Sequence, residues 1–496
     1  MIFRYKKIFG KPMPRFSWAL MIVILAGCAT VGPDYVPPKT SVSPTWYTQL
    51  KGGLTADEVD PETLGAWWNT LEDPELSGLI DRAVLGNLEL KKARARVREA
   101  RARRGVARAD LFPTLDSTAS ATWNRSNKDT GAGKTNDLYV ASFDAGWELD
   151  IFGGVRRSVE AVEADLQVSQ EDLRDVLVSL LAEVALNYIE VRTFQTRLTL
   201  AEANLEAQSE TYQLTLWRYE AGLSDELSVQ QARYNLENTR SQIPTLRTGL
   251  EEAINRIAVL LGEQPGKIHE ELQRQAPIPV TSLKVAVGVP ADLLRRRPDL
   301  RRAERQLAAQ TARVGVAMAD FYPKFTLSGS IGLEALSLSS FSSSGTWTLS
   351  GGPRISWAIF KAGAIRQNIE VQSALQEQYL IAYEAAVLGA LEEVENALVA
   401  YGEEQQRKES LSEATKAAQS AVELAQHKFQ AGLTDFSNVL DAQRSLLSLQ
   451  DQLAQSEGVI TSNLVRLYKA LGGGWTSLES NETRSLSNGE KNEIED

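Results

Sequence analysis

The chain has 496 residues and a formal net charge of −11 at pH 7, from 64 acidic and 53 basic side chains. An acidic protein of this kind is a poor partner for nucleic acid, which binds basic surfaces. A single cysteine excludes a disulfide framework, and the two histidines, His269 and His427, argue against a histidine-based metal site.

The N-terminal segment, up to Gly27, has the layout of a secretory signal. Basic residues without any acid accompany an apolar run from Phe16 to Leu25, which is too short to span a bilayer as a helix. The run leads into Ala26-Gly27-Cys28, which resembles the lipobox at which bacterial lipoprotein signals are cut. The alternative, an incidental thiol, does not explain why the only cysteine stands at this place. We therefore expect removal of residues 1–27 and acylation of Cys28.

The residue after Cys28 is Ala29 rather than aspartate, which in such lipoproteins implies sorting to the outer membrane. No apolar stretch long enough to cross a bilayer as a helix follows Cys28, so the sequence predicts no transmembrane helix in the mature chain. Any membrane-spanning part must therefore consist of strands.

The chain is internally duplicated at a fixed offset of 210 positions. The nine residues from Gly105 to Pro113 match those from Gly315 to Pro323, and the stretch Arg218–Asp225 matches Lys428–Asp435. Because a register held over so much of the chain does not arise by chance, two halves share one structural plan.

Within each half, a proline precedes a stretch in which apolar and polar residues alternate with period two. This alternation predicts β-hairpins at about residues 114–149 and 324–357, with a serine- and glycine-rich turn from Ser337 to Gly345 in the second. Each strand is about 9 to 11 residues long, the length that crosses a bilayer when tilted. One apolar and one polar face are typical of a barrel wall around water.

Four strands cannot close a barrel, since roughly eight is the smallest number that does. Open strand edges are not tolerated in lipid, so several copies of the chain must contribute strands. Two copies would give eight strands and three would give twelve, and the strand pattern alone leaves this choice open.

A long helical pattern follows each hairpin. Apolar residues recur every three or four positions from Val155 to Glu220 without proline or glycine, which predicts a helix of about 100 Å. The stretch Ala221–Asp225 then supplies a glycine for a turn and a cap for a returning helix.

The second half repeats this pattern from Ile365 to Gln430, although Gly389 and Gly402 are expected to interrupt the helix, and the break recurs at Ala431–Asp435. Such long helices have little core of their own. They must pack laterally against neighbours, which again indicates an assembly.

Two basic runs, Lys91–Arg108 and Arg295–Arg302, invite a nucleic-acid interpretation. Export from the cytoplasm argues against it, and solvated helix faces with a helix start at Pro298 explain both runs. The sequence contains no Ser/His/Asp set, metal-ligand cluster or phosphate-binding glycine loop, so we expect no enzyme activity and no cofactor beyond the lipid on Cys28.

Several separate stretches together resemble the TolC-like outer membrane factors, in particular their NodT-type lipoprotein branch from RND (resistance-nodulation-division) pumps. The matching stretches cover nearly the whole chain: Cys28 with Val31–Tyr35, Trp67-Trp68 with Asp73–Leu76, Arg296–Glu304 through to Tyr322-Pro323, and Asp441–Arg444. Any one of these motifs alone would be weak, whereas the set is specific.

The resemblance implies a mixed α and β membrane protein with two tandem repeats, each a transmembrane β-hairpin plus a long α-helical hairpin. It also implies a homotrimer with a 12-strand β-barrel in the outer membrane and a 12-helix periplasmic tunnel. The expected partners are a periplasmic adaptor protein, an inner membrane RND-type transporter and outer membrane lipids, and no nucleic acid.

The function so implied is a passive, gated exit duct of a tripartite efflux system for drugs or other small toxic compounds. A type I protein-secretion duct and a heavy-metal cation efflux duct share the fold and remain alternatives. A structural periplasmic lipoprotein is a remote one, because the amphipathic hairpins argue against it.

The same resemblance assigns roles to two sets of residues. The helix breaks correspond to tips that dock the adaptor, at Gly222, Leu223, Ser224, Gly432, Leu433 and Thr434. Asp441 corresponds to an aspartate ring that narrows the closed pore, where like charges would select cations. Arg444 lies one turn further on and can pair with a carboxylate. Ser437 and Asn438 replace an apolar gate residue and a second aspartate of some relatives, which favours a looser gate or one that relies on Asp441 alone.

We therefore divide the chain into six segments. They are a signal peptide at 1–27, an N-terminal periplasmic or equatorial segment at 28–78, repeat 1 at 79–265, a linker at 266–292, repeat 2 at 293–475, and a polar tail at 476–496 that we expect to be disordered.

Overall fold

The computed structural model describes residues 30–58, 60–129, 133, 135–279 and 285–475. The predicted signal peptide, the lipidation site Cys28 and the predicted disordered tail lie outside these residues. The chain forms two compact units. The sheet unit takes its residues from 1–38, 97–169 and 303–383, and the tip unit takes its residues from 39–96, 170–302 and 384–496.

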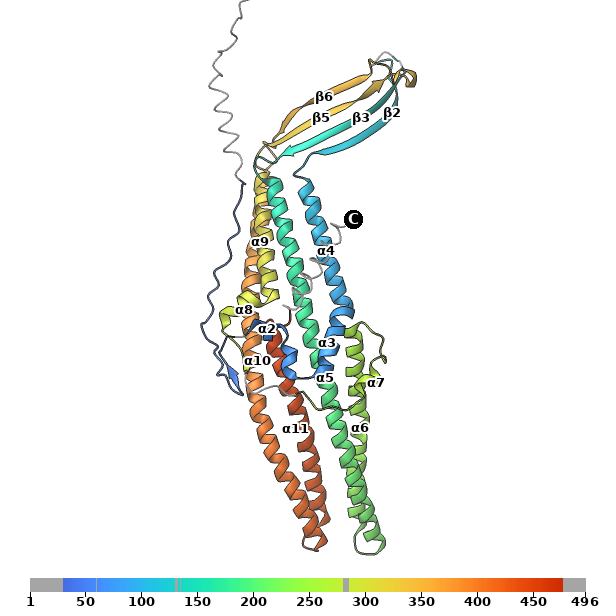
Figure 1. Cartoon of the computed structure of the whole chain (residues 1–496), viewed down its shortest axis with the longest axis vertical. Coiled ribbons are helices and arrows are strands. Elements are labelled where there is room, and N and C mark those ends of the chain that lie inside the picture. The colour runs from blue at the N-terminus through green and yellow to red at the C-terminus, as the bar shows by residue number, and fades with distance from the viewer. Residues whose placement is uncertain (1–29, 59, 130–132, 134, 280–284, 476–496) are drawn as a thin grey trace, which may run out of the picture. The chain divides into compact units, whose positions relative to one another are not determined.

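The sheet unit contains a four-stranded antiparallel sheet in the order β2-β3-β5-β6 (Figure 1). The strands are β2 (Thr114–Arg125), β3 (Thr135–Leu149), β5 (Lys324–Ala335) and β6 (Trp347–Ser356). They have 12, 15, 12 and 10 residues, so the first three exceed the predicted 9 to 11. The predicted serine-rich turn contains the short 3-10 helix η2 (Leu338–Ser340).

The strand register keeps the two faces of the sheet distinct across all four strands. One row places Ser117, Phe143, Ile331 and Leu349 side by side. The adjacent row, on the opposite face, places Asp116, Asp144, Ser330 and Ser350 side by side. The alternation predicted from sequence therefore continues between the two repeats, because β3 of the first pairs with β5 of the second.

The helices repeat as the strands do. The first repeat has α4 (Leu88–Ala109), α5 (Gly154–Glu220) and α6 (Glu226–Leu261), and the second has α9 (Pro298–Ala319), α10 (Ala364–Gln430) and α11 (Phe436–Ala470). Each helix of the second set begins at the position that the sequence duplication assigns to its counterpart, and α5 and α10 have 67 residues each. In Figure 1, α5 turns back into α6 and α10 turns back into α11.

The expected interruption of the second long helix is wrong, because α10 runs unbroken through Gly389 and Gly402. A glycine costs a helix about 1 kcal/mol, and packing of the neighbouring turns outweighs this cost. Ala390 and Tyr401, which directly neighbour these glycines in the chain, are buried. Conversely, α6 continues through Pro244, a residue that usually interrupts a helix, and the sequence pattern gave no indication of this.

The remaining elements belong to the tip unit. They are β1 (Leu54–Thr55), which pairs in parallel with β4 (Val285–Ala286), and the short helices α2 (Pro61–Gly65), η1 (Trp67–Leu71), α3 (Pro74–Gly86), α7 (His269–Leu272) and α8 (Pro290–Arg296). Asp60 and Asp73 cap α2 and α3 through backbone amides of the first turn.

The core of the tip unit is built around Trp67, which is 1% exposed. Its ring stacks on Tyr468 of α11 at 5.5 Å between centroids and meets Trp68 edge-on at 5.9 Å. None of the helices in the described residues combines the length and apolar character that a membrane-spanning helix needs.

Several side chains of the two basic runs pair with acids on a neighbouring helix, which agrees with their interpretation as helix faces. In the sheet unit, Arg104 and Arg108 of α4 pair with Glu163 of α5. In the tip unit, Arg302 of α9 lies 3.0 Å from both Asp172 and Asp175 of α5. These charges therefore join neighbouring helices to one another.

Candidate channel site: tips, gate face and polar seam

The two helix tips close with the same backbone geometry. At the first tip the amide of Leu223 donates to the Arg218 carbonyl at 2.7 Å, and at the second the amide of Leu433 donates to the Lys428 carbonyl at 2.8 Å. Gly222 and Gly432 have φ of +73° and +74°, a left-handed conformation that glycine adopts without strain. Leu223 and Leu433 are left exposed.

The tips differ in how the returning helix is capped. The carboxylate of Asp225 accepts a hydrogen bond from the Ser228 amide at 2.9 Å at the start of α6. Hydrogen bonds from Ser228 lower the pKa of Asp225. Asp435, the equivalent residue before α11, makes no such side-chain bond.

The four predicted gate residues lie on one exposed face of α11. Ser437, Asn438, Asp441 and Arg444 are all exposed. Arg444 forms an ion pair and hydrogen bond with Asp441. The amide of Asn438 donates to Thr434 Oγ1 at 2.8 Å, which fixes this side chain to the tip. The helix thus presents an acidic and a basic group together, one turn apart.

The opposite face of α11 is apolar and packs against the other tip helices. Phe436, Val439 and Leu440 are buried with Ala232 of α6, and the residues packed on them are Tyr212, Ala425 and Phe429. Phe429 and Phe436 lie 5.0 Å apart between ring centroids. Both helical hairpins therefore share one small core near their tips, and the four predicted gate residues lie on the face of α11 away from this core.

A row of polar contacts joins α5 to α11. Arg197 binds Asp451 with two hydrogen bonds of 2.7 and 3.2 Å, and Asn204 donates to Gln450 at 3.0 Å. Gln443 donates to Thr211 at 3.2 Å. We call these three contacts the polar seam.

The α5 members of the polar seam recur with a heptad spacing, which keeps them on one face of the helix. This spacing was the available sequence signal for the seam. The partners of these residues on α11 could not be known from the chain order.

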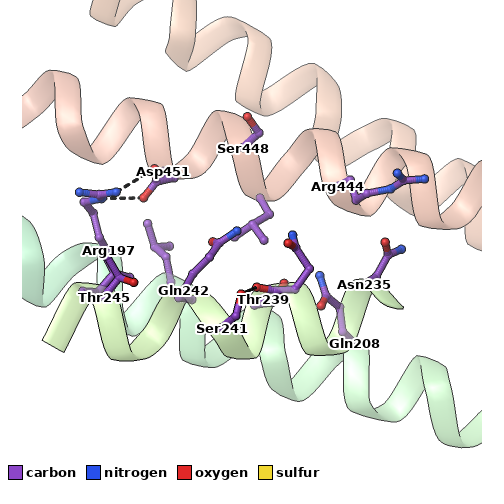
Figure 2. A pocket seen from close by; sticks show the side chains of 15 residues that line it. Arg197, Gln208, Asn235, Thr239, Ser241, Gln242, Thr245, Arg444, Ser448 and Asp451 are labelled. Atoms are coloured by element: carbon purple, nitrogen blue, oxygen red, sulfur yellow. Dashed lines mark hydrogen bonds and ion pairs between the residues drawn. The ribbon is translucent and has the colours of Figure 1, made fainter. Parts of the chain in front are cut away.

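A cavity of about 520 Å³ lies beside the polar seam, between α5, α6 and α11 (Figure 2). Its labelled lining is polar and includes Arg197, Gln208, Asn235, Thr239, Gln242, Arg444 and Asp451. The buried side-chain amide oxygen of Gln208, Oε1, has no hydrogen-bond partner within the described chain. The described residues hold no group of three or more His, Cys, Asp or Glu side chains placed to bind a metal ion. Beside the polar seam, the space between α5, α6 and α11 is thus lined mostly by polar side chains, in contrast to the apolar core nearer the tips.

Comparison with known proteins agrees with this architecture. The model of the family described as "Outer membrane efflux protein" matches residues 79–263 and 289–473. The chain is 34% identical to the solvent efflux pump outer membrane protein SrpC of Pseudomonas putida over 472 residues, which cover 94% of this chain and 98% of that protein. It is 30% identical to the probable outer membrane lipoprotein SilC of Salmonella typhimurium, covering 92% and 97% of the two chains.

Among solved structures, the outer-membrane channel OprN superposes with a TM-score of 0.85 and 38% identity, covering 90% of this chain and all of that one. The chain belongs to the outer membrane efflux protein family, which confirms the resemblance to TolC-like factors. It is an outer membrane channel component of a tripartite efflux system.

Proposed function

We propose that three copies of this chain form a closed duct, with a 12-strand barrel in the outer membrane and a 12-helix tunnel in the periplasm. The observation that carries this proposal is the four-stranded sheet with one apolar and one polar face. Within the described residues, its outer strands, β2 and β6, each pair with one strand only. Three sheets joined edge to edge would pair every strand and enclose a polar lumen.

Lateral packing of the helices supports the same assembly. Ile381, Leu388, Val399 and Leu424 of α10 are large, apolar and exposed. Their separations along α10 are close to whole numbers of helical turns, so they form one stripe. A neighbouring copy that covers this stripe would remove it from water.

The proposed gate lies at the tip end of this duct. Three copies would bring three Asp441 carboxylates around one axis, where they would narrow the pore and favour cations. The Asp441–Arg444 pair offsets part of this charge in the closed state. Asn438 and Ser437 place polar groups beside it, so the constriction relies on Asp441 for its charge.

The tips are the proposed docking points for a periplasmic adaptor protein, which would connect the duct to an inner membrane RND-type transporter. The exposed leucines Leu223 and Leu433, with Ser224 and Thr434 beside them, offer a small apolar contact with a polar rim at each glycine turn. Cys28 would carry the lipid that anchors the chain, and the similarity to a probable outer membrane lipoprotein supports this assignment.

The proposed cargo is small, toxic organic compounds, and similarity to a solvent efflux pump component supports this class. The experiment is the susceptibility of a deletion strain to dyes, antibiotics, solvents, detergents and metal salts, with and without the wild-type gene. Sensitivity to organic compounds that the wild-type gene reverses is the expected result. Sensitivity to metal salts alone would contradict the cargo class, and no change in a strain without redundant ducts would contradict efflux.

A further inference from the structure

The first described residues after the predicted lipidation site are docked within the sheet unit. Residues Thr30–Tyr35, which we call the N-terminal strap, contact the junction of β3 with α5 and the side of α9. The amide of Val31 donates to the Phe152 carbonyl at 3.0 Å, just before α5 begins. The strap is therefore hydrogen-bonded at the junction between β3 and α5.

Arg157 of α5 is the centre of this contact. Its side chain is only 4% exposed, and it donates to the Val31 carbonyl at 3.1 Å and to the Gly32 carbonyl at 3.3 Å. It also binds the Asp34 carboxylate at 2.6 Å and the Glu160 carboxylate at 2.7 Å. A guanidinium so buried needs these acceptors, and three of the four are supplied by the strap.

Glycines allow the strap to approach the helices this closely. A Cβ atom on Gly32 would lie 2.5 Å from the Cα of Gly315 in α9, and a Cβ on Gly153 would lie 2.6 Å from the Thr30 side chain. Both Gly32 and Gly153 have positive φ, at +93° and +81°. Backbone packs directly on backbone here, which fixes the position of the strap more tightly than side-chain contacts alone.

Tyr35 secures the other end of the strap. Its hydroxyl donates to Glu304 Oε1 at 2.9 Å, and its ring packs on the buried Ala164, Ala308 and Ala309. The Arg305 guanidinium lies over this ring, 5.4 Å from its centroid. The two ends of the strap are thus held by different chemistry on α5 and α9.

We infer that the N-terminal strap positions the lipid anchor, and that Arg157 is the positioning residue that holds it. This inference rests on the proposed acylation of Cys28. Three peptide units join Cys28 to Val31, and consecutive Cα atoms are about 3.8 Å apart, so the tether is at most about 11 Å long. Acyl chains would therefore enter the membrane next to the β3–α5 junction, where Phe152 stacks on Tyr322 at 4.6 Å. A docked strap sets the depth of the strands relative to the lipid surface, which a free linker would not do.

The test measures exposure of the strap in the full chain. A Val31→Cys variant in isolated outer membranes is labelled with a polar maleimide, and its rate is compared with and without Arg157→Met. We expect Arg157→Met to raise the labelling rate at least tenfold. The matched control is Arg104→Met, which removes an ion pair of the same unit that does not touch the strap. Equal rates in all three proteins would overturn docking of the strap by Arg157.

A second pair of variants keeps the test decisive if Arg157→Met fails to accumulate. Asp34→Asn and Tyr35→Phe each remove one strap contact, and the Asp34 side chain is 86% exposed. We expect each to raise labelling several-fold in protein that is fully assembled. Unchanged labelling in both would contradict the docking.

The link to the lipid is tested separately. The chain without Val31→Cys contains only Cys28, so its labelling would overturn the proposed acylation and leave the result on strap docking intact. A Cys28→Ser chain exported by a non-lipoprotein signal has no lipid on residue 28 for the strap to position. In this chain, Arg157→Met should therefore leave the amount of assembled outer membrane protein unchanged. A loss of assembled protein in this chain would mean that Arg157 stabilises the fold independently of the anchor, which would overturn the positioning role.

Discussion

Arg192 is a fully buried guanidinium whose partners come from separate segments of the tip unit. It forms an ion pair with Glu75 of α3, donates to the Arg274 carbonyl at 2.7 Å, and donates to the Tyr188 hydroxyl at 3.0 Å. The Tyr188 hydroxyl in turn donates to Asp73 at 2.7 Å. Burial and the bond to Asp73 raise the pKa of Tyr188, so this hydroxyl stays protonated and continues to donate. This network ties the segment around α3 and the segment after α7 to α5.

We expect Arg192→Met to destabilise the protein by about 3 to 5 kcal/mol, because it leaves a partly buried Glu75 carboxylate without its charge partner. Tyr188→Phe removes one hydroxyl from the same network and should cost about 1 kcal/mol. Thermal unfolding of the detergent-solubilised protein compares the two. Equal, small effects would show that the network contributes little.

A close approach of two helices in the tip unit depends on one glycine. A Cβ atom on Gly458 of α11 would lie 2.1 Å from Thr193 Oγ1 and 3.1 Å from Thr193 Cγ2, both on α5. We expect Gly458→Ala to cost about 1 to 3 kcal/mol through overpacking. Thr193→Ala removes the two nearest of these atoms and leaves only Thr193 Cβ at 3.2 Å, so the double variant should recover most of the loss. An additive double variant would contradict direct contact between these two positions.

At the scale of elements, the two helical hairpins have tips with matching glycine turns but unequal caps. Of the two returning helices, α6 begins with a side-chain cap from Asp225, whereas the equivalent Asp435 leaves the first turn of α11 without one. The start of α11 is held by its apolar core instead, through Phe436 and Val439. The first tip therefore depends on a hydrogen bond and the second on packing.

We expect Asp225→Ala to speed amide hydrogen exchange in the first turn of α6, and Asp435→Ala to leave the first turn of α11 unchanged. Because the pKa of Asp225 is lowered in the folded chain, its contribution is complete above the unfolded value of about 3.9 and is lost as the pH falls through the lower folded value. The wild-type first tip should therefore loosen in acid. Equal responses of the two tips would contradict the difference in capping.

At the scale of the whole molecule, the repeat was predictable and the contacts between repeats were not. Period-two alternation and 3.6-residue periodicity are local, so they identified the hairpins, both long helices and the tips at Gly222 and Gly432. Pairing of β3 with β5 and the polar seam join residues far apart in the chain, which no local pattern reveals. Docking of the strap by Arg157 was missed for the same reason.

The lengths of the strands and the continuity of α10 also could not be predicted from local sequence patterns. Ladder pairing with a neighbouring strand extends β3 beyond its alternating stretch, and packing overrides the weak helix propensity of Gly389 and Gly402. The gate residues were placed by resemblance, and the shared exposed face of Asp441 and Arg444 adds a structural reason for grouping them.

The proposed assembly makes a prediction for the exposed stripe of α10. Leu388→Glu should prevent formation of the trimer, because a carboxylate would have to be buried between copies. Leu388→Met, which keeps the size and apolar character of the side chain, is the control and should assemble normally. Cross-linking and native mass measurement of the membrane-extracted protein decide the outcome. A Leu388→Glu protein that still forms trimers would contradict the use of this stripe.

The polar seam bears on how the two hairpins would part if the proposed gate opens between them. When Asn204 and Gln450 part, water takes the place of each lost hydrogen bond, so the number of bonds is nearly conserved. Parting an apolar contact of similar size would instead expose hydrocarbon to water. In the proposed gate, the hydrogen bonds of the seam could therefore break on opening and form again on closing, without refolding of the helices. Asn204→Leu combined with Gln450→Leu should convert it into a permanent closure, giving a protein that assembles normally and no longer restores efflux.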